Sequence, residues 1–183
     1  MARLTGLLGE GSYFAGGEGD LRTRCIVRWP GHVPPGRTSN EIMHVTDWFT
    51  TLLRAAGVSP PSDRVIDGVD QLGWLTGSAD SSARDGLIFW MGPEMYGAKW
   101  HDFKLVLVIQ KYLTEPALRL ATPHIINLIT DPQEREPIPL PHLHTWAATH
   151  FNRIISEFQA TVQREPLIPA GAPLDHTPAP HTT

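Results

Sequence analysis

The sequence has few cysteines, few lysines and no long apolar run. With one cysteine, Cys25, among 183 residues, the chain forms no intrachain disulfide, so its cysteine content indicates no redox compartment. The first lysine is Lys99 and the net charge is -4, which argues against nucleic acid as a partner because such proteins show a basic patch. No apolar run approaches membrane-spanning length, so a membrane partner is not predicted either.

The N-terminal residues and the overall length give two further expectations. The first fourteen residues hold no sustained apolar run, which predicts no signal peptide and makes the cytoplasm the default location, with the compartment otherwise unknown. The chain is 41% hydrophobic and 19% charged, a composition that allows a sizeable core. The length fits one domain or a domain with a tail.

The hydrophobic pattern changes at residues 78–85 (SADSSARD), where we predict a boundary. Residues 1–78 are expected to add one strand and one helix to a larger α/β sheet. Residues 79–165 are expected to form a small α+β unit, a four-stranded antiparallel sheet with one covering helix. Residues 166–183, rich in proline, alanine and threonine, are expected to be a disordered tail.

Within these units, local patterns predict the individual elements. The strand is expected at residues 25–29, with Cys25 buried in it, and a helix is expected from the N-cap Thr46 to Ala56. The apolar stripe of that helix should pack on the sheet: Val45, Trp48, Phe49, Leu52, Leu53 and Ala56. The antiparallel strands are expected at residues 87–91, 96–100, 103–109 and 125–129, and the covering helix at 145–165.

Two polar features favour structural roles over ligand binding. The segment from Asp67 to Asp70 lacks the alternating carboxylates and terminal glutamate of a calcium loop, so a hydrogen-bonded turn is expected there. His44 precedes the predicted helix, where a hydrogen-bonded structural histidine is expected rather than a metal ligand.

The segment from Gly16 to Gly31 (GGEGDLRTRCIVRWPG) combines a glycine-rich charged loop with a short β-prone run. Glycines at 16, 17 and 19 allow tight turns or close approach to a ligand, and Glu18, Arg22 and their neighbours supply charge. A loop of this kind beside a buried strand is typical of the active-site edge of an α/β protein. Taken alone, a glycine-rich loop of this kind more commonly forms an ordinary turn before a strand.

Four blocks of the sequence resemble the C-terminal half of arylsulfatases, in the alkaline-phosphatase superfamily. The first is Glu18-Gly19-x-x-Arg22 followed by residues 26–31, IVRWPG. The others, in the family's order and approximate spacing, are residues 44–53, 64–70 and 127–134. Together the blocks cover about residues 9 to 136. The resemblance implies the C-terminal part of a sulfatase-type α/β sheet domain.

The resemblance also suggests which residues border a sulfate pocket. Glu18 and Arg22 are the main candidates, with Tyr13 and Lys99 as weaker ones. Arg22 would orient the anion while Glu18 holds Arg22 by a charge-assisted pair. Alternatively, Glu18 and Arg22 pair only to fix the loop. Many sulfatases have a sulfate-contacting lysine where this chain has Tyr13, and Lys104 is expected to be a solvated turn residue.

Other parts of sulfatase chemistry have no counterpart in the sequence. The family's nucleophile is a formylglycine made within a Cys/Ser-x-Pro/Ala-x-Arg motif, and neither Cys25 nor any serine fits that motif. The family's calcium or magnesium is held by carboxylate pairs that lie upstream of this segment. We therefore predict no catalytic residue, metal ligand or cofactor in this chain, and no activity of the chain alone. A full-length relative would bind calcium or magnesium and a sulfate ester, and the N-terminal sulfatase portion is a candidate partner.

Two alternatives remain open at this point. The first is a fragment of a phosphonate or phosphodiester hydrolase of the same superfamily, which the upstream nucleophile motif would distinguish. The second is a non-enzymatic α+β interaction module, which solubility and monomeric behaviour of the isolated chain would favour.

Overall fold

A computed structural model describes residues 16–110, 114–135, 138–139, 144–166, 168 and 171–173. Tyr13 and most of the predicted tail 166–183 lie outside these residues. The elements are α1 (Glu18–Leu21), α2 (Asp47–Ala55), α3 (Leu72–Thr76), β1 (Gly86–Met91), β2 (Glu94–Trp100), β3 (Phe103–Ile109), β4 (Leu118–Asn127), β5 (Ile138–Pro139), the 3₁₀ helix η2 (Thr145–Ala147) and α4 (Ala148–Arg164). No helix in the described part of the chain is long and apolar enough to cross a membrane.

The strands form one sheet in the order β1-β2-β3-β4-β5, with every neighbouring pair antiparallel. The predicted four-stranded antiparallel sheet is confirmed, and the two-residue strand β5 adds an edge beside β4. Strand β4 begins at Leu118, before the predicted run, because residues 118 and 119 pair with Ile109 and Val108 beyond a register shift. A tight turn joins β2 to β3, and His101 within it has a positive φ of 46°.

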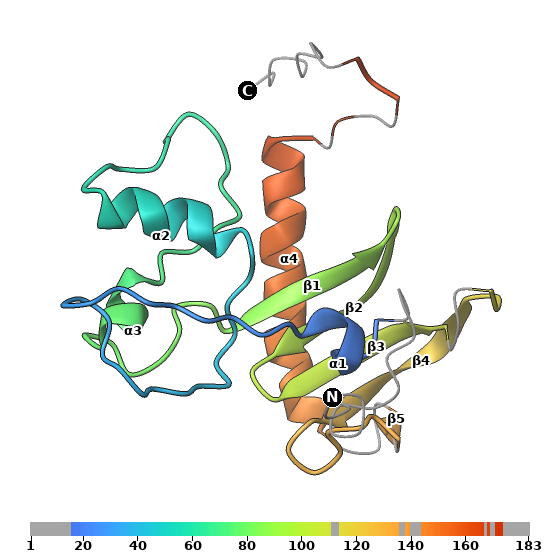
Figure 1. Cartoon of the computed structure of the whole chain (residues 1–183). Helices are drawn as coiled ribbons and strands as arrows, with labels where there is room; N and C mark the ends of the chain where they lie inside the picture. The colour runs from blue at the N-terminus through green and yellow to red at the C-terminus, as the bar shows by residue number, and fades with distance from the viewer. Residues whose placement is uncertain are drawn as a thin grey trace.

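Helix α4 covers one face of the sheet, behind the strands in Figure 1. Its fully buried Phe151 packs into a core with Ala98, Leu105 and Ile125, one residue from each of β2, β3 and β4. Alternate residues of a strand point to one face, so these side chains meet the helix together. The predicted covering helix is therefore confirmed, with its first turn in 3₁₀ form.

The segment that contains α1 lies on the opposite face of the sheet, in front of the strands in Figure 1. That face holds a second apolar cluster of Phe89, Tyr96 and Val108. Gly16, with a φ of 74°, sits over this cluster, and a Cβ built on it would lie 3.5 Å from the Phe89 ring. The backbone of the glycine-rich segment therefore packs directly on the sheet.

Helix α2 forms as predicted but packs with its polar side inward. Its buried side chains are Asp47, Thr50 and Thr51, while Phe49 and Leu52 of the apolar stripe are 50% and 59% exposed. Thr50 donates a hydrogen bond to the Gly68 carbonyl, and Thr51 accepts one from the backbone N–H of Gln71. The prediction that the stripe packs on a sheet was wrong for the described residues.

The loop that α2 packs on approaches the Thr46 backbone at the start of the helix very closely. This close approach requires glycine at position 68. A Cβ built on Gly68 would lie 2.3 Å from the Thr46 carbonyl oxygen, a distance that real side chains do not show. Asp70 caps the start of α3 by accepting a bond from the Leu72 N–H. Residues 67–70 are therefore a hydrogen-bonded loop, but no hydrogen bond closes a turn within them, so the turn predicted there was wrong. His44 is hydrogen-bonded as expected, its ring nitrogen lying 2.8 Å from the Thr46 hydroxyl.

Residues 22–29 follow α1 as an extended segment with no strand partner among the described residues, so the strand predicted at 25–29 was wrong. Cys25 is exposed rather than buried, and Ile26 is 92% exposed. A strand needs a neighbour to satisfy its backbone groups, and none of the strands β1–β5 pairs with residues 25–29.

The segment predicted to be a linker, residues 78–85, is bonded to the rest of the molecule. Asp47 is fully buried and accepts bonds from the Arg84 guanidinium at 2.5 to 3.0 Å, as well as from the backbone N–H groups of His44 and Val69. Ser82 donates to the Ile42 carbonyl and the Gln71 side-chain oxygen. These bonds join α2, the 67–71 loop and the start of the sheet, while the boundary itself stays a prediction.

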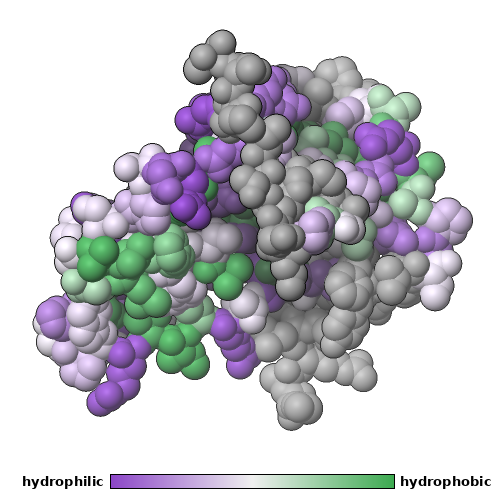
Figure 2. Space-filling model, turned by 90° about the horizontal axis from the view of Figure 1, so that it is seen from above, coloured by the Kyte–Doolittle hydropathy of each residue, from purple (hydrophilic) through white to green (hydrophobic). Residues whose placement is uncertain are grey.

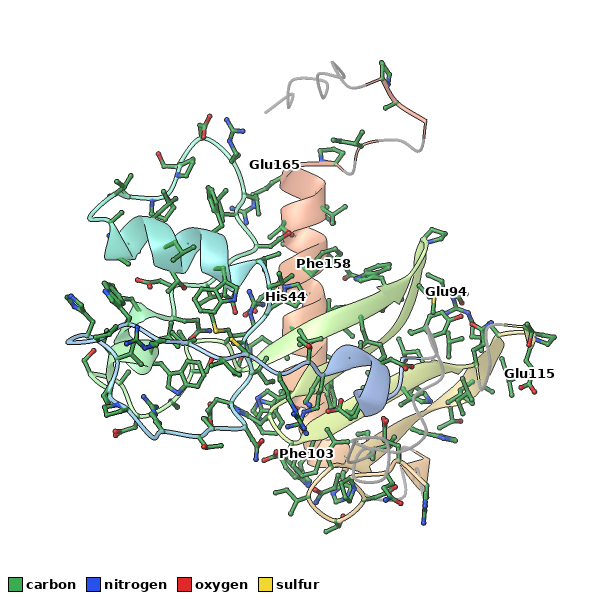
Figure 3. The ribbon with its side chains drawn as sticks, in the orientation of Figure 1. His44, Glu94, Phe103, Glu115, Phe158 and Glu165 are labelled. Carbon is green, nitrogen blue, oxygen red and sulfur yellow. The ribbon has the colours of Figure 1, made fainter. Side chains whose placement is uncertain are left out.

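The far end of α4 is also bonded to the first part of the chain. Glu165 directly follows the helix, and its carboxylate accepts a bond of 2.6 Å from the Val65 N–H. Figure 3 shows Glu165 at the end of α4, beside the loop that follows α2.

Candidate functional site

Glu18 lies at the centre of the candidate site, in α1, on the face of the sheet opposite α4. Its side chain is 1% exposed. A buried carboxylate is costly unless charged or hydrogen-bonding partners compensate it. Glu18 meets that condition through lysines from two adjacent strands, β2 and β3.

Lys99 and Lys104 supply the compensating positive charge. The Lys99 Nζ lies 2.6 Å from the Glu18 Oε2, and the Lys104 Nζ lies 3.7 Å from the Glu18 Oε1. The two lysines are directly cross-strand partners, so they emerge side by side on the face that α1 covers. Lys104 is itself 1% exposed, so its interpretation as a solvated turn residue was wrong.

Glu134 is a member of this network that the sequence analysis missed as a site residue. Its Oε1 accepts a bond of 2.5 Å from the Lys104 Nζ, and its Oε2 accepts one of 2.6 Å from the Glu18 backbone N–H. Lys104 also donates to the Gly16 carbonyl at 2.6 Å. The pair of Glu134 and Lys104 therefore holds the backbone of residues 16–18 at two points. The sequence signal that could have identified Glu134 was its position at the end of the 127–134 block.

Arg22 lies at the partly exposed edge of the network. Its Nε is 4.0 Å from the Glu18 Oε2, and its Nη2 donates a bond of 3.1 Å to the Asn40 side-chain oxygen. The short ion pair of Glu18 is with Lys99 rather than with Arg22, so Arg22 is not held mainly by Glu18. The structure thus brings Glu18, Arg22 and Lys99 together, whereas Tyr13 lies outside the described residues.

The donor set of this network suits an anion rather than a metal cation. Both carboxylates already contact lysine ammonium groups, which occupy the places that a cation would take. Among the described residues, no group of three His, Cys, Asp or Glu side chains could hold a metal ion. A guanidinium has five N–H donors and its bond to Asn40 uses one, so Arg22 retains donors for an oxyanion at the exposed edge.

No protein-family model matches the chain. Among curated proteins, it is 31% identical over 168 residues to the N-acetylgalactosamine-6-sulfatase of Canis lupus familiaris, a match that covers 80% of this chain and 31% of the relative. It is 37% identical over 99 residues to the steryl-sulfatase of Mus musculus, covering 51% of this chain and 16% of the relative. The chain therefore spans less than a third of the length of these relatives.

Solved structures show the same partial match in three dimensions. The PsFucS1 sulfatase from Pseudoalteromonas sp. superposes with a TM-score of 0.65 at 24% identity, covering 75% of this chain and 29% of that one. The protein BT4656, solved in complex with its substrate D-glucosamine-2-N,6-O-disulfate, superposes with a TM-score of 0.54 at 23% identity, covering 77% and 28%. At these identities, the likeness establishes the shared fold.

Proposed function

Because this chain belongs to the sulfatases, as part of their C-terminal portion, we propose that it forms one wall of the sulfate-binding pocket of a sulfuric ester hydrolase. The observation that carries the proposal is the buried network around Glu18. Two strands and the 134 region hold the 16–22 segment in one position, and Arg22 lies at its partly exposed edge. To orient an oxyanion, a cationic side chain must be held in a fixed position, and this network would hold Arg22 in that way.

The residues of the network have different roles in this proposal. Arg22 would donate hydrogen bonds to the sulfate oxygens of the substrate, for which a planar guanidinium is well suited. Lys99 adds positive charge beside it, although its short contact with Glu18 makes it chiefly a partner of that carboxylate. Glu18 positions Lys99 and the backbone that leads to Arg22, and it has no proton-transfer role here.

The reaction itself would depend on groups contributed by the rest of a sulfatase. The chain contains no Cys/Ser-x-Pro/Ala-x-Arg motif, so the formylglycine nucleophile would come from another part of the enzyme. Calcium or magnesium, held by carboxylates outside the described residues, would neutralise charge on the sulfate group. The substrate class is a sulfate ester, a proposal supported by the relatives' names and by the sulfated sugar bound to BT4656.

A chimera tests the role of Arg22. We would replace the matched segment of the Canis N-acetylgalactosamine-6-sulfatase with this chain and measure kcat/KM for hydrolysis of a sulfate ester. Arg22→Ala should lower kcat/KM by about 100-fold, the loss typical for one donor to a developing oxyanion. Arg22→Lys should recover part of that loss, because it restores the charge without the planar fork.

The matched control is Arg119→Ala, which removes an exposed arginine paired with Glu94 at the opposite end of the sheet from α2. Figure 3 shows Glu94 at that end. The control variant should leave kcat/KM unchanged. Equal kcat/KM values for the Arg22→Ala and Arg119→Ala chimeras, with equal thermal stability, would assign Arg22 to a structural role and end the proposal.

A further inference from the structure

We propose that a small polar hollow beside Arg22, called here the hydroxyl site, binds a free hydroxyl group in the alcohol portion of the sulfate ester. Its lining residues come from the stretch before α2 and from the turn between β2 and β3: Asn40, Glu41, Ile42, His101 and Asp102. The preferred substrate is then a sulfated sugar rather than an aryl sulfate. The identity of this ligand rests on the proposed function, because the hydroxyl belongs to the same substrate as the sulfate group.

Arg22 adjoins the hydroxyl site through Asn40. The Arg22 Nη2 donates a bond of 3.1 Å to the Asn40 side-chain oxygen, and Asn40 lines the hollow. That bond leaves the amide nitrogen of Asn40 as a donor, and no described residue accepts a bond from it. Figure 1 shows the stretch before α2 running past the end of the sheet where β2 turns into β3. A sulfate group bound by Arg22 therefore has the hydroxyl site beside it.

The size and the charge of the hydroxyl site suit one neutral hydroxyl group. Its volume is about 30 Å³, enough for about two water-sized groups and too small for a sugar ring or an aryl ring. Glu41 and Asp102 contribute carboxylates, which accept a hydroxyl proton and repel a second anionic group. Asn40 contributes a donor. A hydroxyl both donates and accepts, so it satisfies both kinds of lining group.

Other occupants fit this lining less well. An aryl group needs apolar neighbours, and Ile42 is the one apolar residue among the five that line the hollow. Figure 2 shows hydrophobic side chains gathered elsewhere, over the end of the molecule where α2 lies in Figure 1. In the described part of the chain, no group of three His, Cys, Asp or Glu side chains could hold a metal ion, so a metal cation is not the expected ligand.

The turn that carries His101 and Asp102 is fixed in place, while the two side chains are free to bind. The His101 N–H donates a bond of 2.9 Å to the Asp85 carbonyl, and the Asp102 carbonyl accepts one of 2.8 Å from the Leu128 N–H. Within the described ranges, neither side chain makes a hydrogen bond or an ion pair. His101 has a positive φ of 46°, where glycine is favoured, so the turn geometry does not account for a histidine there. A fixed backbone that presents unbonded polar side chains is suited to recognising a ligand.

Substrate preference of the Canis chimera described above tests the hydroxyl site. We would measure kcat/KM for N-acetylgalactosamine 6-sulfate and for 4-nitrophenyl sulfate, whose alcohol portion has no free hydroxyl. Asp102→Ala should lower kcat/KM for the sugar sulfate by about 10-fold, the loss of one hydrogen bond to a charged group, and should change that for the aryl sulfate by less than about twofold. Asp102→Asn should recover part of the loss, because it keeps an acceptor oxygen. The matched control, Glu157→Ala, removes an exposed carboxylate from α4 and should change neither value.

Two results for Asp102→Ala would overturn the hydroxyl site: an equal loss for both substrates, or no loss for the sugar sulfate. Arg22→Ala distinguishes these results from a failure of the proposed function. Since both substrates carry the sulfate group, Arg22→Ala should lower kcat/KM for both. Unchanged values for both substrates in Arg22→Ala would end the proposed function, whereas the comparison of the two substrates in Asp102→Ala is read independently of that result.

Amide NMR spectra of the free chain provide a second readout that needs no turnover. N-acetylgalactosamine 6-sulfate, at about 10 mM to allow for a millimolar Kd, should shift the His101 amide in the wild type and not in Asp102→Ala. At the same concentration, 4-nitrophenyl sulfate should shift the Arg22 amide and leave the His101 amide in place. An unshifted His101 amide with the sugar sulfate, or an equal shift with the aryl sulfate, would overturn the hydroxyl site.

Discussion

Lys104 is a charged residue buried among partners that are distant in the sequence. Its ammonium group contacts the Gly16 carbonyl, 88 positions away, and the Glu134 carboxylate, 30 positions away. It also lies 5.1 Å from the centre of the Phe89 ring. This one side chain therefore connects the glycine-rich segment, the sheet and the region after β4.

Removing that ammonium group should be costly. Lys104→Met keeps most of the side-chain volume but leaves Glu134 and Glu18 buried with less positive charge, so we expect a loss of about 3 kcal/mol in the free energy of unfolding. Urea denaturation of the free chain measures it. The control, Arg119→Met, breaks an exposed ion pair and should cost less than about 1 kcal/mol. Equal losses would show that the Lys104 contacts do not contribute as described.

The buried carboxyl of Asp47 should make the free energy of unfolding depend on pH. Burial raises the pKa of this carboxyl, but the Arg84 guanidinium and the backbone N–H groups of Val69 and His44 outweigh burial and hold the pKa below its ordinary value of 3.8. Because the folded state has the lower pKa, the stabilisation is present above about pH 4 and is lost as the pH falls through the lowered value.

The Asp47→Asn variant should lack this acid-sensitive contribution. We expect it to be less stable than the wild type by about 3 kcal/mol at pH 7, with the difference shrinking as the pH falls below about 4. Denaturant unfolding across that range provides the measurement. A difference that stays constant with pH would contradict the assignment of the ionised Asp47 to the Arg84 contact.

Helices α4 and α2 differ in how much their aromatic residues contribute to the stability of the free chain. Phe151 of α4 is fully buried against three strands, whereas Phe49 of α2 is half exposed. Phe151→Ala should therefore cost about 4 kcal/mol and Phe49→Ala less than about 1 kcal/mol in the free chain. Thermal unfolding monitored by circular dichroism compares the two. A Phe49→Ala loss as large as that of Phe151→Ala would mean that α2 packs through its apolar side.

Elements whose partners are close in the sequence were predictable. The runs at 87–91, 96–100 and 103–109 are β-prone, alternate with turns and pair with their sequence neighbours. The helix at 145–165 repeats apolar residues at helical spacing and covers the sheet that precedes it. For these elements, local pattern and tertiary packing agree.

Elements whose partners are distant were not predictable in the same way. The patterns at 25–29 and in the α2 stripe specify a buried strand and a buried helix face, but they do not say whether the covering surface is in this chain. Lys104 alternates with buried apolar residues along β3, which places it on the opposite face of the sheet. Lys104 is buried because residues 16–18 cover it. The sequence around Lys104 does not indicate that these distant residues lie on that face. The resemblance pointed to Glu18 as a site residue. It also covered Glu134, but no pattern in the sequence indicated that Glu134 lies beside Glu18.

For the molecule as a whole, the described residues form one sheet with a helix on one face and the charged network around Glu18 on the other. That network holds the backbone of residues 16–18 against the sheet, while nothing in the sequence supplies the nucleophile motif of a sulfatase. On the proposed function, the binding geometry and the reactive group would be carried by different parts of a sulfatase.

An aryl sulfate assay of residues 1–183 tests the claim most directly. Purified chain is incubated with a chromogenic aryl sulfate and added calcium or magnesium, and release of the chromophore is followed against a buffer blank. We expect no turnover above the blank, because the sequence lacks the nucleophile motif and no group of three His, Cys, Asp or Glu side chains in the described part of the chain could hold a cation. Turnover that persists in the Cys25→Ala variant would reveal a nucleophile within this chain and contradict the division of roles between this chain and the rest of a sulfatase.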